Sequence, residues 1–589
     1  MQTQSSRAQD AAAAYDARPW LRSYPPHVPH SLTYPHQSVW QTLLGVVDTF
    51  GDRPAFVFQG ESLSYSDMLR HSQRFSAALS KAGVCRGDRV LAFLPNVPHF
   101  PVVYYGTLRL GAALAGVSPR SVERELESAI RDSGAKTVIT LDLLYDKISR
   151  VWEAAGVENV IVGSVVDFMP AWKRLAARLA RKVPVPTAPI PYGRRVHRMR
   201  DFLASGRGWS VTEEARPDDV ALLQYTGGTT GLPKAAMLTH ENLLSNARQG
   251  RALFPALKEG NETIMGILPF FHIYAVTLVL NIGLLVGART VLFPKGLDMA
   301  EIFDGIRRYR PTVFPGVPTV YVSLINDRRS KSADMSSIEI CVSGGAPLPI
   351  EVKRDFEALT HGHLLEAYGL SETSPVTHCQ PYDGSGKVGS IGLTLPDTDA
   401  RIVDADTGEA VPVGSDGELV IRGPQVMRGY WNRPEETADV LRNGWLHTGD
   451  IARMDDDGYF YIVDRKKDLI ITGGENIYPR EIEEVLFEHP KVKEAAVVGV
   501  PHSRGGEIAK AFVVLKAGEQ SNKSEMSRFV SERLAKHKVP RAVEFRDSLP
   551  MSAAGKVLRR VLAEEERAKR ATAPSDDPPS VTTSEEQTT

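Results

Sequence analysis

The chain has 589 residues, of which 42% are hydrophobic and 24% are charged, and its formal net charge is −1. This composition is ordinary for a folded globular protein, and the near-zero charge gives no overall argument for a nucleic-acid or membrane partner. The length predicts several structural units, about four by length alone. The three cysteines, at positions 85, 341 and 379, lie too far apart for a metal-binding motif, which predicts reduced thiols in a cytosolic protein.

The two ends of the chain lack the patterns of folded segments. Residues 1–17 are polar and alanine-rich without an apolar core, which predicts disorder and no signal peptide. Residues 569–589 are rich in Ser, Thr, Pro, Asp and Glu, which also predicts disorder. The longest apolar stretch, residues 275–288, is too short to span a bilayer and predicts a core helix. We therefore expect a cytoplasmic protein.

Strands and helices alternate through most of the first 370 residues. Residues 61–82 begin as a strand and continue with Met68, Leu69, Phe75 and Leu79 at helical spacing. The other predicted elements are strands at 89–94, 135–141 and 338–342, a helix at 102–113 and a helix that starts at Pro349. This alternation predicts an α/β fold, in which helices cover the faces of a mostly parallel sheet.

The pattern changes in the last third of the chain. Between residues 389 and 461 the strands are short and turns are frequent, which predicts an antiparallel region. A small α+β unit follows, with a strand pair at 459–463 and 469–472, a helix that starts at Pro479, a helix at 525–535, and strands at 495–500 and 511–515. We place a large N-terminal domain at residues 18–466 and a small, mobile C-terminal domain at residues 467–568.

Residues 168–200 differ in character, because they carry nine basic residues and no acidic one. The apolar residues Trp172, Leu175, Ala176 and Leu179 share one face of a predicted helix, and Lys173, Arg174, Arg178 and Arg181 cover the rest. Such a helix can lie on an anionic membrane surface. Alternatively, it is a solvated basic helix that packs on its own domain through a narrow apolar stripe.

The most informative stretch is the Gly/Thr-rich sequence at residues 224–240, which follows a short apolar run. Its glycines allow the backbone to approach a ligand closely, and its hydroxyls, amides and lysine offer donors and a positive charge. This chemistry indicates a phosphate cradle, although a glycine-rich hairpin turn is the alternative. It is not a Walker A loop, since Pro233 and the strand-like residues 235–239 stand where such a loop would open a helix.

Five further stretches accompany this loop along the chain. They are Leu268–His272, Ser343–Leu348, Tyr368–Thr373, Gly444–Asp450 with the following Asp464–Asp468, and Pro550–Lys556. In this order and at these intervals they resemble the adenylate-forming superfamily of acyl-CoA synthetases, peptide-synthetase adenylation domains and beetle luciferase. The resemblance covers roughly residues 35–565. It is strongest to long-chain fatty-acid–CoA ligases, through the segment that begins at Trp20 and the basic segment.

The resemblance implies a role for each stretch. The phosphates of ATP would be held by Thr226, Gly227, Gly228, Thr229, Thr230, Gly231 and Lys234. The rest of the nucleotide would be bound by Gly344, Gly345, Ala346, Tyr368, Gly369, Ser371, Asp450 and Arg465. Glu372 would hold Mg²⁺, which prefers oxygen ligands, and His272 would have a gating or positioning role. Lys556 would be the main catalytic residue and Lys467 the hinge between the domains.

The implied reaction joins a fatty acid to coenzyme A in two steps. The carboxylate and ATP first give acyl-AMP and pyrophosphate, and the thiol of coenzyme A then gives acyl-CoA and AMP. Residues 268–320 would form an acyl pocket for medium or long chains. One alternative is an aryl- or medium-chain acid–CoA ligase, or an acyl-AMP ligase that loads a carrier protein. Another is a non-catalytic, membrane-associated module that binds acyl groups and nucleotides.

The resemblance also bears on partners and location. It implies a homodimer as one option for the assembly. A cytoplasmic location is the first option. The second option is a cytoplasmic protein that makes peripheral contact with the inner face of a membrane through the basic segment at 170–182. No nucleic-acid partner is expected.

Overall fold

The computed structural model describes residues 2–179, 186, 189–212, 214–226, 234–465, 468–472, 475–501, 507–552 and 557–571. The chain divides into two compact units, the first spanning Met1–Lys466 and the second formed by Lys467–Ser552 and Val557–Thr589. The first unit contains two large α/β sheets and a smaller antiparallel sheet, and the second is a small α+β unit. The predicted α/β fold class is therefore confirmed.

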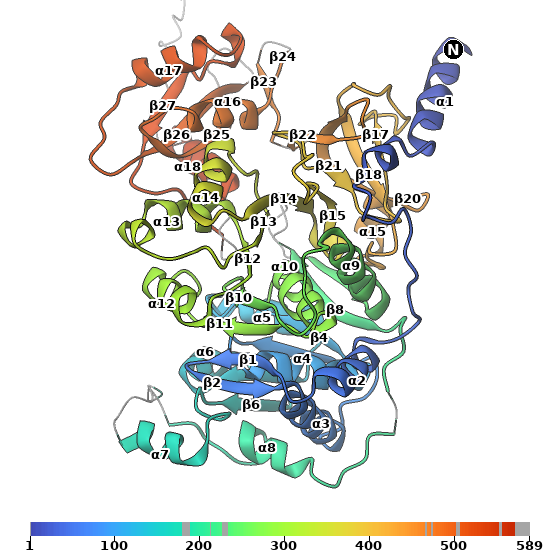
Figure 1. The fold of residues 1–589 in the computed structure, drawn as a ribbon, viewed down its shortest axis with the longest axis vertical. Coiled ribbons are helices and arrows are strands. Elements are labelled where there is room, and N and C mark those ends of the chain that lie inside the picture. The colour runs from blue at the N-terminus through green and yellow to red at the C-terminus, as the bar shows by residue number, and fades with distance from the viewer. Residues whose placement is uncertain are drawn as a thin grey trace, which may run out of the picture. The chain divides into compact units, whose positions relative to one another are not determined.

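An eight-stranded sheet is built mainly from the first half of the chain, which is coloured blue to green in Figure 1, and its strands follow the order β19-β9-β8-β4-β3-β5-β6-β7. Its strands are β3 (Arg89–Phe93), β4 (Ala113–Gly116), β5 (Thr137–Leu141), β6 (Asn159–Gly163), β7 (Val196–Arg198), β8 (Val220–Thr226), β9 (Lys234–Thr239) and β19 (Gly429–Tyr430). The strands from β8 to β7 run parallel, whereas β9 is antiparallel to both of its neighbours, β8 and β19.

A nine-stranded sheet follows, in the order β16-β15-β14-β13-β12-β10-β11-β1-β2. Its strands are β1 (Pro54–Phe58), β2 (Glu61–Ser64), β10 (Thr263–Gly266), β11 (Arg289–Leu292), β12 (Val313–Gly316), β13 (Ile340–Gly344), β14 (His363–Gly369), β15 (Val376–Cys379) and β16 (Leu393–Thr394). The strands from β1 to β14 are parallel, and β2, β15 and β16 add antiparallel edges.

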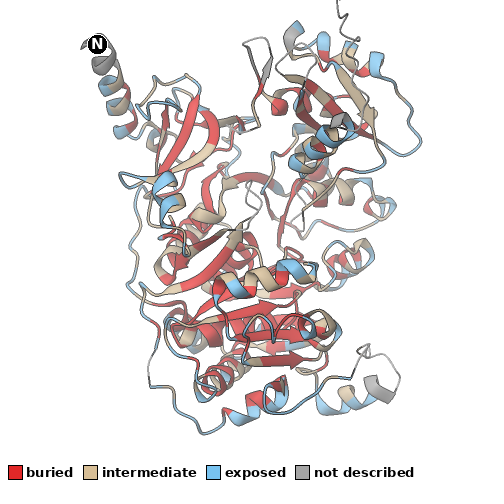
Figure 2. Cartoon of the chain, turned by 180° about the vertical axis from the view of Figure 1, so that it is seen from behind, coloured by how far each residue is buried: buried red, intermediate tan, exposed pale blue. Residues whose placement is uncertain are grey.

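Helices cover these sheets, as the buried strands require. They are α2 (Val39–Phe50), α3 (Tyr65–Lys81), α4 (His99–Arg109), α5 (Glu123–Ser133), α6 (Tyr145–Ser149), α8 (Met199–Ser205), α9 (His240–Leu253), α12 (Met299–Tyr309), α13 (Pro318–Asn326) and α14 (Ile350–Thr360). Ser64 caps α3, and Met68, Phe75 and Leu79 are buried, which confirms the helix predicted there. One large hydrophobic cluster joins residues of both sheets, and the strands are largely buried in Figure 2.

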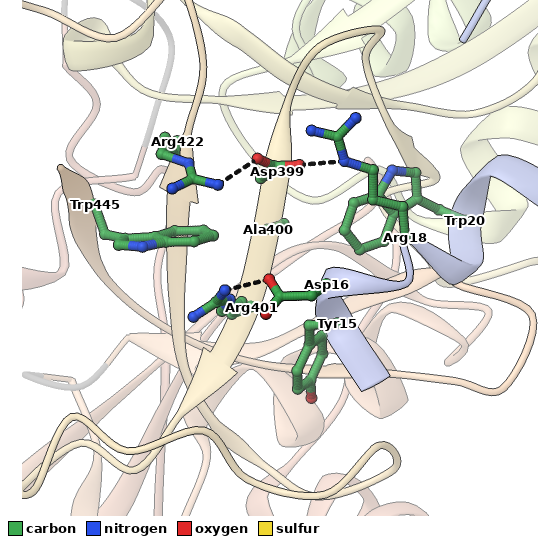
Figure 3. Close-up of a pocket in the computed structure, with 9 residues that line it drawn as sticks. All are labelled: Tyr15, Asp16, Arg18, Trp20, Asp399, Ala400, Arg401, Arg422 and Trp445. Carbon is green, nitrogen blue, oxygen red and sulfur yellow. Dashed lines mark hydrogen bonds and ion pairs between the residues drawn. The ribbon is translucent and has the colours of Figure 1, made fainter. Parts of the chain in front are cut away.

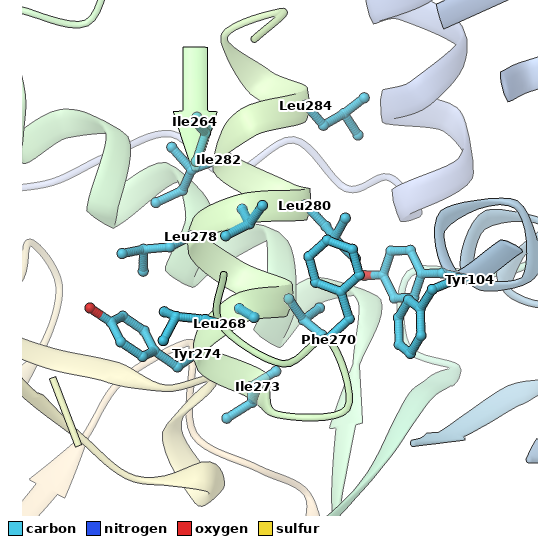
Figure 4. Close-up of a cluster of buried hydrophobic side chains, with 14 of the residues drawn as sticks. Tyr104, Ile264, Leu268, Phe270, Ile273, Tyr274, Leu278, Leu280, Ile282 and Leu284 are labelled. Atoms are coloured by element: carbon cyan, nitrogen blue, oxygen red, sulfur yellow. The ribbon is translucent and has the colours of Figure 1, made fainter. Parts of the chain in front are cut away.

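The longest apolar stretch of the sequence forms a helix within this core. It runs through α10 (Ile273–Ala275), a π-helical segment η3 (Val276–Asn281) and α11 (Ile282–Leu285), and almost all of its side chains are buried (Figure 4). The predicted core helix is thus confirmed, with a π-helical middle that hydrophobic periodicity does not reveal. Among the described residues, every helix is too short or too polar to cross a bilayer.

The predicted antiparallel region forms a five-stranded sheet, in which β21 is longer than the predicted short strands. They are β17 (Asp399–Val403), β18 (Gly417–Arg422), β20 (Leu441–Arg442), β21 (Trp445–Met454) and β22 (Phe460–Arg465), and helix α15 (Pro434–Val440) lies in the same region. The predicted pairing of 459–463 with 469–472 is wrong, since β22 pairs with β21, and β23 (Ile470–Thr472) pairs with β24 (Glu475–Ile477). A pattern of two adjacent strands does not specify their partners.

The second unit has its own hydrophobic core and a three-stranded sheet. Its strands are β25 (Val492–Pro501), β26 (Glu507–Leu515) and β27 (Ala542–Phe545), and its helices are α16 (Pro479–Phe487), α17 (Lys523–Ser531) and α18 (Arg559–Ala571). Ile482, Val485 and Leu486 of α16 face this core. Helix α18 includes the first residues of the predicted disordered tail, and the remainder of that tail lies outside the described residues.

The structure differs from the sequence prediction at the N-terminus. Residues predicted to be disordered form helix α1 (Gln2–Asp16), which precedes the 3₁₀ helix η1 (Pro19–Ser23). Tyr15 and Trp20 are buried in a cluster with residues of the five-stranded sheet. Two buried aromatic side chains provide the tertiary contacts that a window of polar, alanine-rich sequence does not show.

Part of the basic segment forms helix α7 (Ala171–Leu179). The orientation of this helix differs from the predicted alternative in which a narrow apolar stripe packs on the domain. Trp172 and Leu175 are 67% and 60% exposed. Lys173 and Arg174 are less exposed, because Lys173 forms an ion pair with Glu61 and Arg174 donates to backbone carbonyls of its own domain. The helix is therefore attached through Lys173 and Arg174, and Trp172 and Leu175 face solvent.

Candidate functional site

The glycine-rich stretch connects two paired strands. Thr226 ends β8 and Lys234 begins β9, and the two residues are cross-strand neighbours. The Thr226 hydroxyl donates to the Lys234 carbonyl across 3.3 Å. Residues 227–233 lie outside the described part of the chain, so Gly227, Gly228, Thr229, Thr230 and Gly231 remain predictions. The strand predicted after the loop is confirmed, which excludes the strand–loop–helix arrangement of a Walker A site.

Ala235 follows Lys234 at the start of β9. It is buried with Ala113, Ala115 and Leu223 in a small cluster of residues from β4, β8 and β9. The Ala235 methyl group therefore fills the space beneath β9. Ala235 belongs to the cross-strand pair next to Thr226 and Lys234, which stand at the two ends of the loop. This packing gives Ala235 a structural role at the start of β9.

Lys234 and Glu372 are brought together by Tyr430, which the sequence analysis did not identify. The Tyr430 hydroxyl donates to Oε1 of Glu372 at 2.7 Å, and the Lys234 ammonium lies 5.4 Å from the centre of the Tyr430 ring. Burial and the nearby Glu372 carboxylate raise the pKa of Tyr430, so the phenol keeps its proton and donates. Tyr430 lies on β19, a two-residue strand beside β9, which no periodic pattern in the sequence reveals.

The predicted adenine-binding residues lie at the ends of two neighbouring strands. Gly344 ends β13 and pairs with Ala367 of β14, directly before Tyr368. A Cβ atom on Gly344 would lie 3.2 Å from the Tyr274 ring, and one on Gly369 would lie 2.0 Å from the Pro375 carbonyl. Gly369 is therefore needed for close packing, whereas a methyl group at Gly344 would require the Tyr274 ring to shift by a few tenths of an ångström. The prediction that the strand ends at this glycine-rich turn is confirmed.

Asp450 is buried and has a side-chain partner on each carboxylate oxygen. The Tyr368 hydroxyl donates to Oδ2 at 2.6 Å, and Nε of Arg465 lies 3.1 Å from Oδ1. Asp450 and Arg465 are cross-strand neighbours on β21 and β22, which explains their proximity. Desolvation and the Asp450 carboxylate raise the pKa of Tyr368, so this phenol also donates.

Six of the described candidate residues, together with Tyr430, therefore form two groups. The phosphate-side group is Thr226, Lys234, Glu372 and Tyr430, and the nucleoside-side group is Tyr368, Asp450 and Arg465. The end of β14 and the following 3₁₀ helix η5 (Ser371–Thr373) connect them, since Tyr368 and Glu372 are only four residues apart. Helix η5 also contacts β8 and β9.

His272 precedes helix α10 and acts there as a cap. Its Nδ1 accepts a hydrogen bond from the backbone N–H of Tyr274 at 3.3 Å. The adjacent Phe271 carbonyl accepts from the Gln224 side chain of β8 at 3.1 Å. This contact ties the Leu268–His272 stretch to the strand that leads into the loop. The geometry fits the predicted positioning role of His272 better than a role as a general base.

Lys467 and Lys556, the predicted hinge and the main predicted catalytic residue, lie outside the described residues.

The prediction that Glu372 holds Mg²⁺ can be compared with the chemistry of the donor atoms at this position. Glu372 is partly exposed, and its Oε1 is engaged by Tyr430. Mg²⁺ is usually held by one or two carboxylates together with water and phosphate oxygens, so a single partly exposed carboxylate beside hydroxyl groups fits it. Among the described residues, three or more His, Cys, Asp or Glu side chains do not gather around one point.

Comparison with known protein families agrees with this geometry. Residues 45–431 match the family of AMP-binding enzymes, and residues 481–556 match the C-terminal domain of AMP-binding enzymes. The chain belongs to the AMP-binding enzyme family. The superfamily membership predicted from the sequence motifs is thereby confirmed.

Relatives of this AMP-binding enzyme match it over nearly its full length. A long-chain-fatty-acid–CoA ligase of Bacillus subtilis is 44% identical over 553 residues, which cover 93% of this chain and 98% of the relative. A ligase of the same name from Escherichia coli O6:H1 is 40% identical over 565 residues, with the same coverage of both chains. ATP-bound MatB from Rhodopseudomonas palustris is 30% identical, with a TM-score of 0.77, and covers 90% of this chain and 99% of its own.

Proposed function

We propose that this AMP-binding enzyme is an ATP-dependent long-chain fatty-acid–CoA ligase. The observation that carries the proposal is the segment from Tyr368 to Glu372. Its first residue bonds Asp450 of the nucleoside-side group, and its last bonds Tyr430 of the phosphate-side group. One short segment can therefore contact both ends of ATP. The fatty-acid substrate is inferred from the names of the relatives described above.

In the first step, a carboxylate oxygen of the fatty acid attacks the α-phosphorus of ATP. The new oxygen–phosphorus bond makes a mixed carboxylic–phosphoric anhydride, the bond from the α-phosphorus to the oxygen that bridges the α- and β-phosphates breaks, and pyrophosphate leaves with the bonding electron pair. We assign Thr226 and Lys234 to the leaving phosphates, and Asp450 would accept from the two ribose hydroxyls. Mg²⁺, held by Glu372 when bound, would neutralise part of the phosphate charge.

Lys556 is the residue that we assign to the α-phosphate. Its ammonium would bridge the fatty-acid carboxylate and the phosphate, two anions that otherwise repel each other. Preorganised positive charge at a site of developing negative charge contributes about 3–4 kcal/mol for one good donor.

In the second step, the thiol sulfur of coenzyme A attacks the acyl carbon. A thioester forms, the bond to the phosphate oxygen breaks, and AMP leaves while the thiol proton passes to solvent. Lys556 has no part in this step. We therefore propose that Lys467 is a hinge that exchanges the Lys556 loop for residues 473–476 between the two steps.

The acyl chain is proposed to bind within residues 268–320. This stretch is rich in buried apolar side chains, including Phe314, Val317 and Val320. Each buried methylene contributes about 0.8 kcal/mol, so a long chain binds more tightly than a short one. The hydroxyls of Tyr274 and Tyr321 both donate to the Val342 carbonyl, which ties the stretch to the nucleotide-binding end of β13.

Pyrophosphate release tests this function directly. The protein is incubated with ATP, Mg²⁺ and a series of fatty and aromatic acids, with and without coenzyme A. We expect release that depends on a long-chain acid and an acyl-CoA product when coenzyme A is present. A preference for aromatic acids would favour the aryl ligase, and release without thioester would favour an enzyme that loads a carrier protein. No acid-dependent release would favour the non-catalytic module.

Substitution of Lys556 tests the two-step assignment. Lys556→Ala should abolish acyl-AMP formation but still convert preformed acyl-AMP and coenzyme A into acyl-CoA. Lys569→Ala, on helix α18, is the control and should support both steps. Equal loss of both half-reactions in folded Lys556→Ala protein would contradict the assignment.

Membrane contact through α7 is a second proposal, which the exposed Trp172 and Leu175 favour. Apolar side chains beside a segment of nine basic residues suit the interface of an anionic bilayer. We expect Trp172→Ser with Leu175→Ser to reduce pelleting with phosphatidylglycerol vesicles, and Leu143→Ser, another exposed leucine, to leave it unchanged. Unchanged pelleting of the double variant would exclude this contact.

The homodimer implied by the sequence resemblance is a further proposal about partners. Light scattering coupled to gel filtration measures the mass of the particle directly. A mass twice that of the 64.6 kDa chain would support it, and a mass equal to one chain would exclude it.

A further inference from the structure

An unbroken series of aromatic rings connects the N-terminal segment with the nucleoside-side group. Trp20 lies 6.1 Å from Phe460, Phe460 lies 4.7 Å from His378, and His378 lies 5.8 Å from Tyr368, measured between ring centres. The rings are tilted or edge-to-face, and these distances are typical of favourable aromatic pairs. The Tyr368 hydroxyl then donates to Asp450. We call Trp20, Phe460, His378 and Tyr368 the aromatic series.

The members of the series are firmly held. Trp20, Phe460 and His378 are each at most 1% exposed. His378 and Tyr368 are cross-strand neighbours on β15 and β14, so their relative position is fixed by the sheet. Burial lowers the pKa of His378 to about 3, which leaves its ring neutral. His378 therefore acts as a packing aromatic residue, with Nδ1 2.9 Å from the Thr377 hydroxyl.

The outer end of the series is clamped to the five-stranded sheet. Arg18 pairs with Asp399 at 2.8 Å, and the other oxygen of Asp399 pairs with Arg422 at the same distance (Figure 3). Asp16 pairs with Arg401 on the same strand, and the Ser23 hydroxyl donates to the Asp457 carbonyl at 2.7 Å. These contacts flank Trp20 on both sides in sequence.

A glycine allows the closest part of this approach. Gly458 has φ +82°, and a Cβ atom at this position would lie 2.4 Å from Cα of Trp20. Only glycine tolerates both that backbone conformation and that contact. The turn between β21 and β22 therefore packs closely against Trp20. Asp450 lies on β21 and Arg465 lies on β22.

We propose that Trp20 is a positioning residue for ATP, which acts through Phe460 and His378 on the Tyr368 ring and the Asp450 carboxylate. This inference rests on the proposed function, because it takes Tyr368 and Asp450 as the nucleoside-binding residues. Close-packed interiors transmit small displacements, and small errors in position are costly in a binding site. Loss of the Trp20 ring should therefore weaken ATP binding although Trp20 does not touch ATP.

The test compares the KM for ATP with kcat and with the KM for the fatty acid. Trp20→Leu removes the ring and keeps apolar volume, so it should raise the KM for ATP about three- to tenfold and leave the other two constants within about twofold. Trp20→Phe should restore most of the loss. Equilibrium dialysis of ATP should show the same increase in Kd. Trp152→Leu, a buried tryptophan outside the series, is the control and should not change the KM for ATP selectively.

A double-mutant cycle separates positioning from a general loss of structure. In a Tyr368→Phe background the link to Asp450 is already broken, so Trp20→Leu should have little additional effect on the KM for ATP. Full additivity, or an unchanged KM for ATP in folded Trp20→Leu, would overturn the proposal. If Trp20→Leu does not fold, Phe460→Leu is measured with the same criteria. An unchanged KM in Asp450→Asn would instead refute the proposed nucleoside site itself.

Discussion

The phosphate-side and nucleoside-side groups are built differently, although only three residues of chain separate Tyr368 from Glu372. On the phosphate side, Glu372 is partly exposed and the hydroxyl of one tyrosine holds Oε1. On the nucleoside side, Asp450 is buried, and side chains engage both of its oxygens. The first group resembles an open carboxylate site, and the second is a preorganised network.

This difference indicates how each group should respond to substitution. An open carboxylate that binds a cation contributes mainly through its charge, so removal of the charge should be the most damaging change. A buried network contributes through the positions of its donors and acceptors, so loss of one acceptor should weaken binding of one substrate. The predictions below separate these two responses.

The largest effect is expected at Glu372. Glu372→Gln keeps the shape and one hydrogen-bond acceptor but removes the charge, and we expect kcat for pyrophosphate release to fall about 10²- to 10³-fold. The half-saturating Mg²⁺ concentration should rise at the same time. Glu435→Gln, an exposed residue of α15, is the control and should behave as wild type. A variant with normal Mg²⁺ dependence would show that Glu372 does not hold the metal.

The next effect is expected at Asp450, and it should be confined to ATP. The Asp450 carboxylate has two acceptor oxygens for the Tyr368 hydroxyl, the Arg465 guanidinium and the two ribose hydroxyls of the proposed complex. An asparagine has only one acceptor oxygen for these donors. Hydrogen bonds to charged groups contribute about 1.5–3 kcal/mol, so Asp450→Asn should raise the KM for ATP about 10- to 100-fold. The KM for the fatty acid should stay constant, as should every constant of Asp456→Asn, an exposed neighbour. A change in kcat alone would contradict a binding role.

From the sequence one could predict candidate residues for each of the two groups, but not the side-chain contacts that connect those residues. The phosphate loop, Glu372, Asp450 and Arg465 lie in local motifs, and the strand after the loop follows from the residues around Pro233. Tyr430 could not be predicted, because its contact with Glu372 depends on a two-residue strand 58 positions away.

The N-terminus illustrates the same physical limit. Residues 1–17 read as disordered because their folding depends on Tyr15 and Trp20, whose partners lie more than 350 residues away in sequence. The exposed Trp172 and Leu175 are the converse case. Their spacing predicts a helix, but spacing alone does not say which face of the helix meets the domain.

A smaller effect is expected at the junction of the two groups. Gly369 lies between them, and a methyl group there would meet the Pro375 carbonyl. Gly369→Ala should lower stability by about 1–3 kcal/mol through overpacking, seen as a lower midpoint of thermal unfolding. Both the KM for ATP and the rate of pyrophosphate release should suffer, since the backbone shift reaches both groups. Gly45→Ala, in helix α2 with open space around it, is the control. An unchanged midpoint would show that the junction is pliable.

The smallest effect is expected at Tyr430, and it decides whether the phosphate side is truly open. Tyr430→Phe removes the hydroxyl that donates to Glu372 but keeps the ring beside Lys234. Since Glu372 is partly exposed, water can replace the lost donor, and we expect kcat to fall only about two- to tenfold. Tyr192→Phe, a partly exposed tyrosine elsewhere, should have no effect. A loss as large as that of Glu372→Gln would mean that Tyr430 fixes the carboxylate in place. The phosphate side would then be as dependent on preorganised geometry as the nucleoside side.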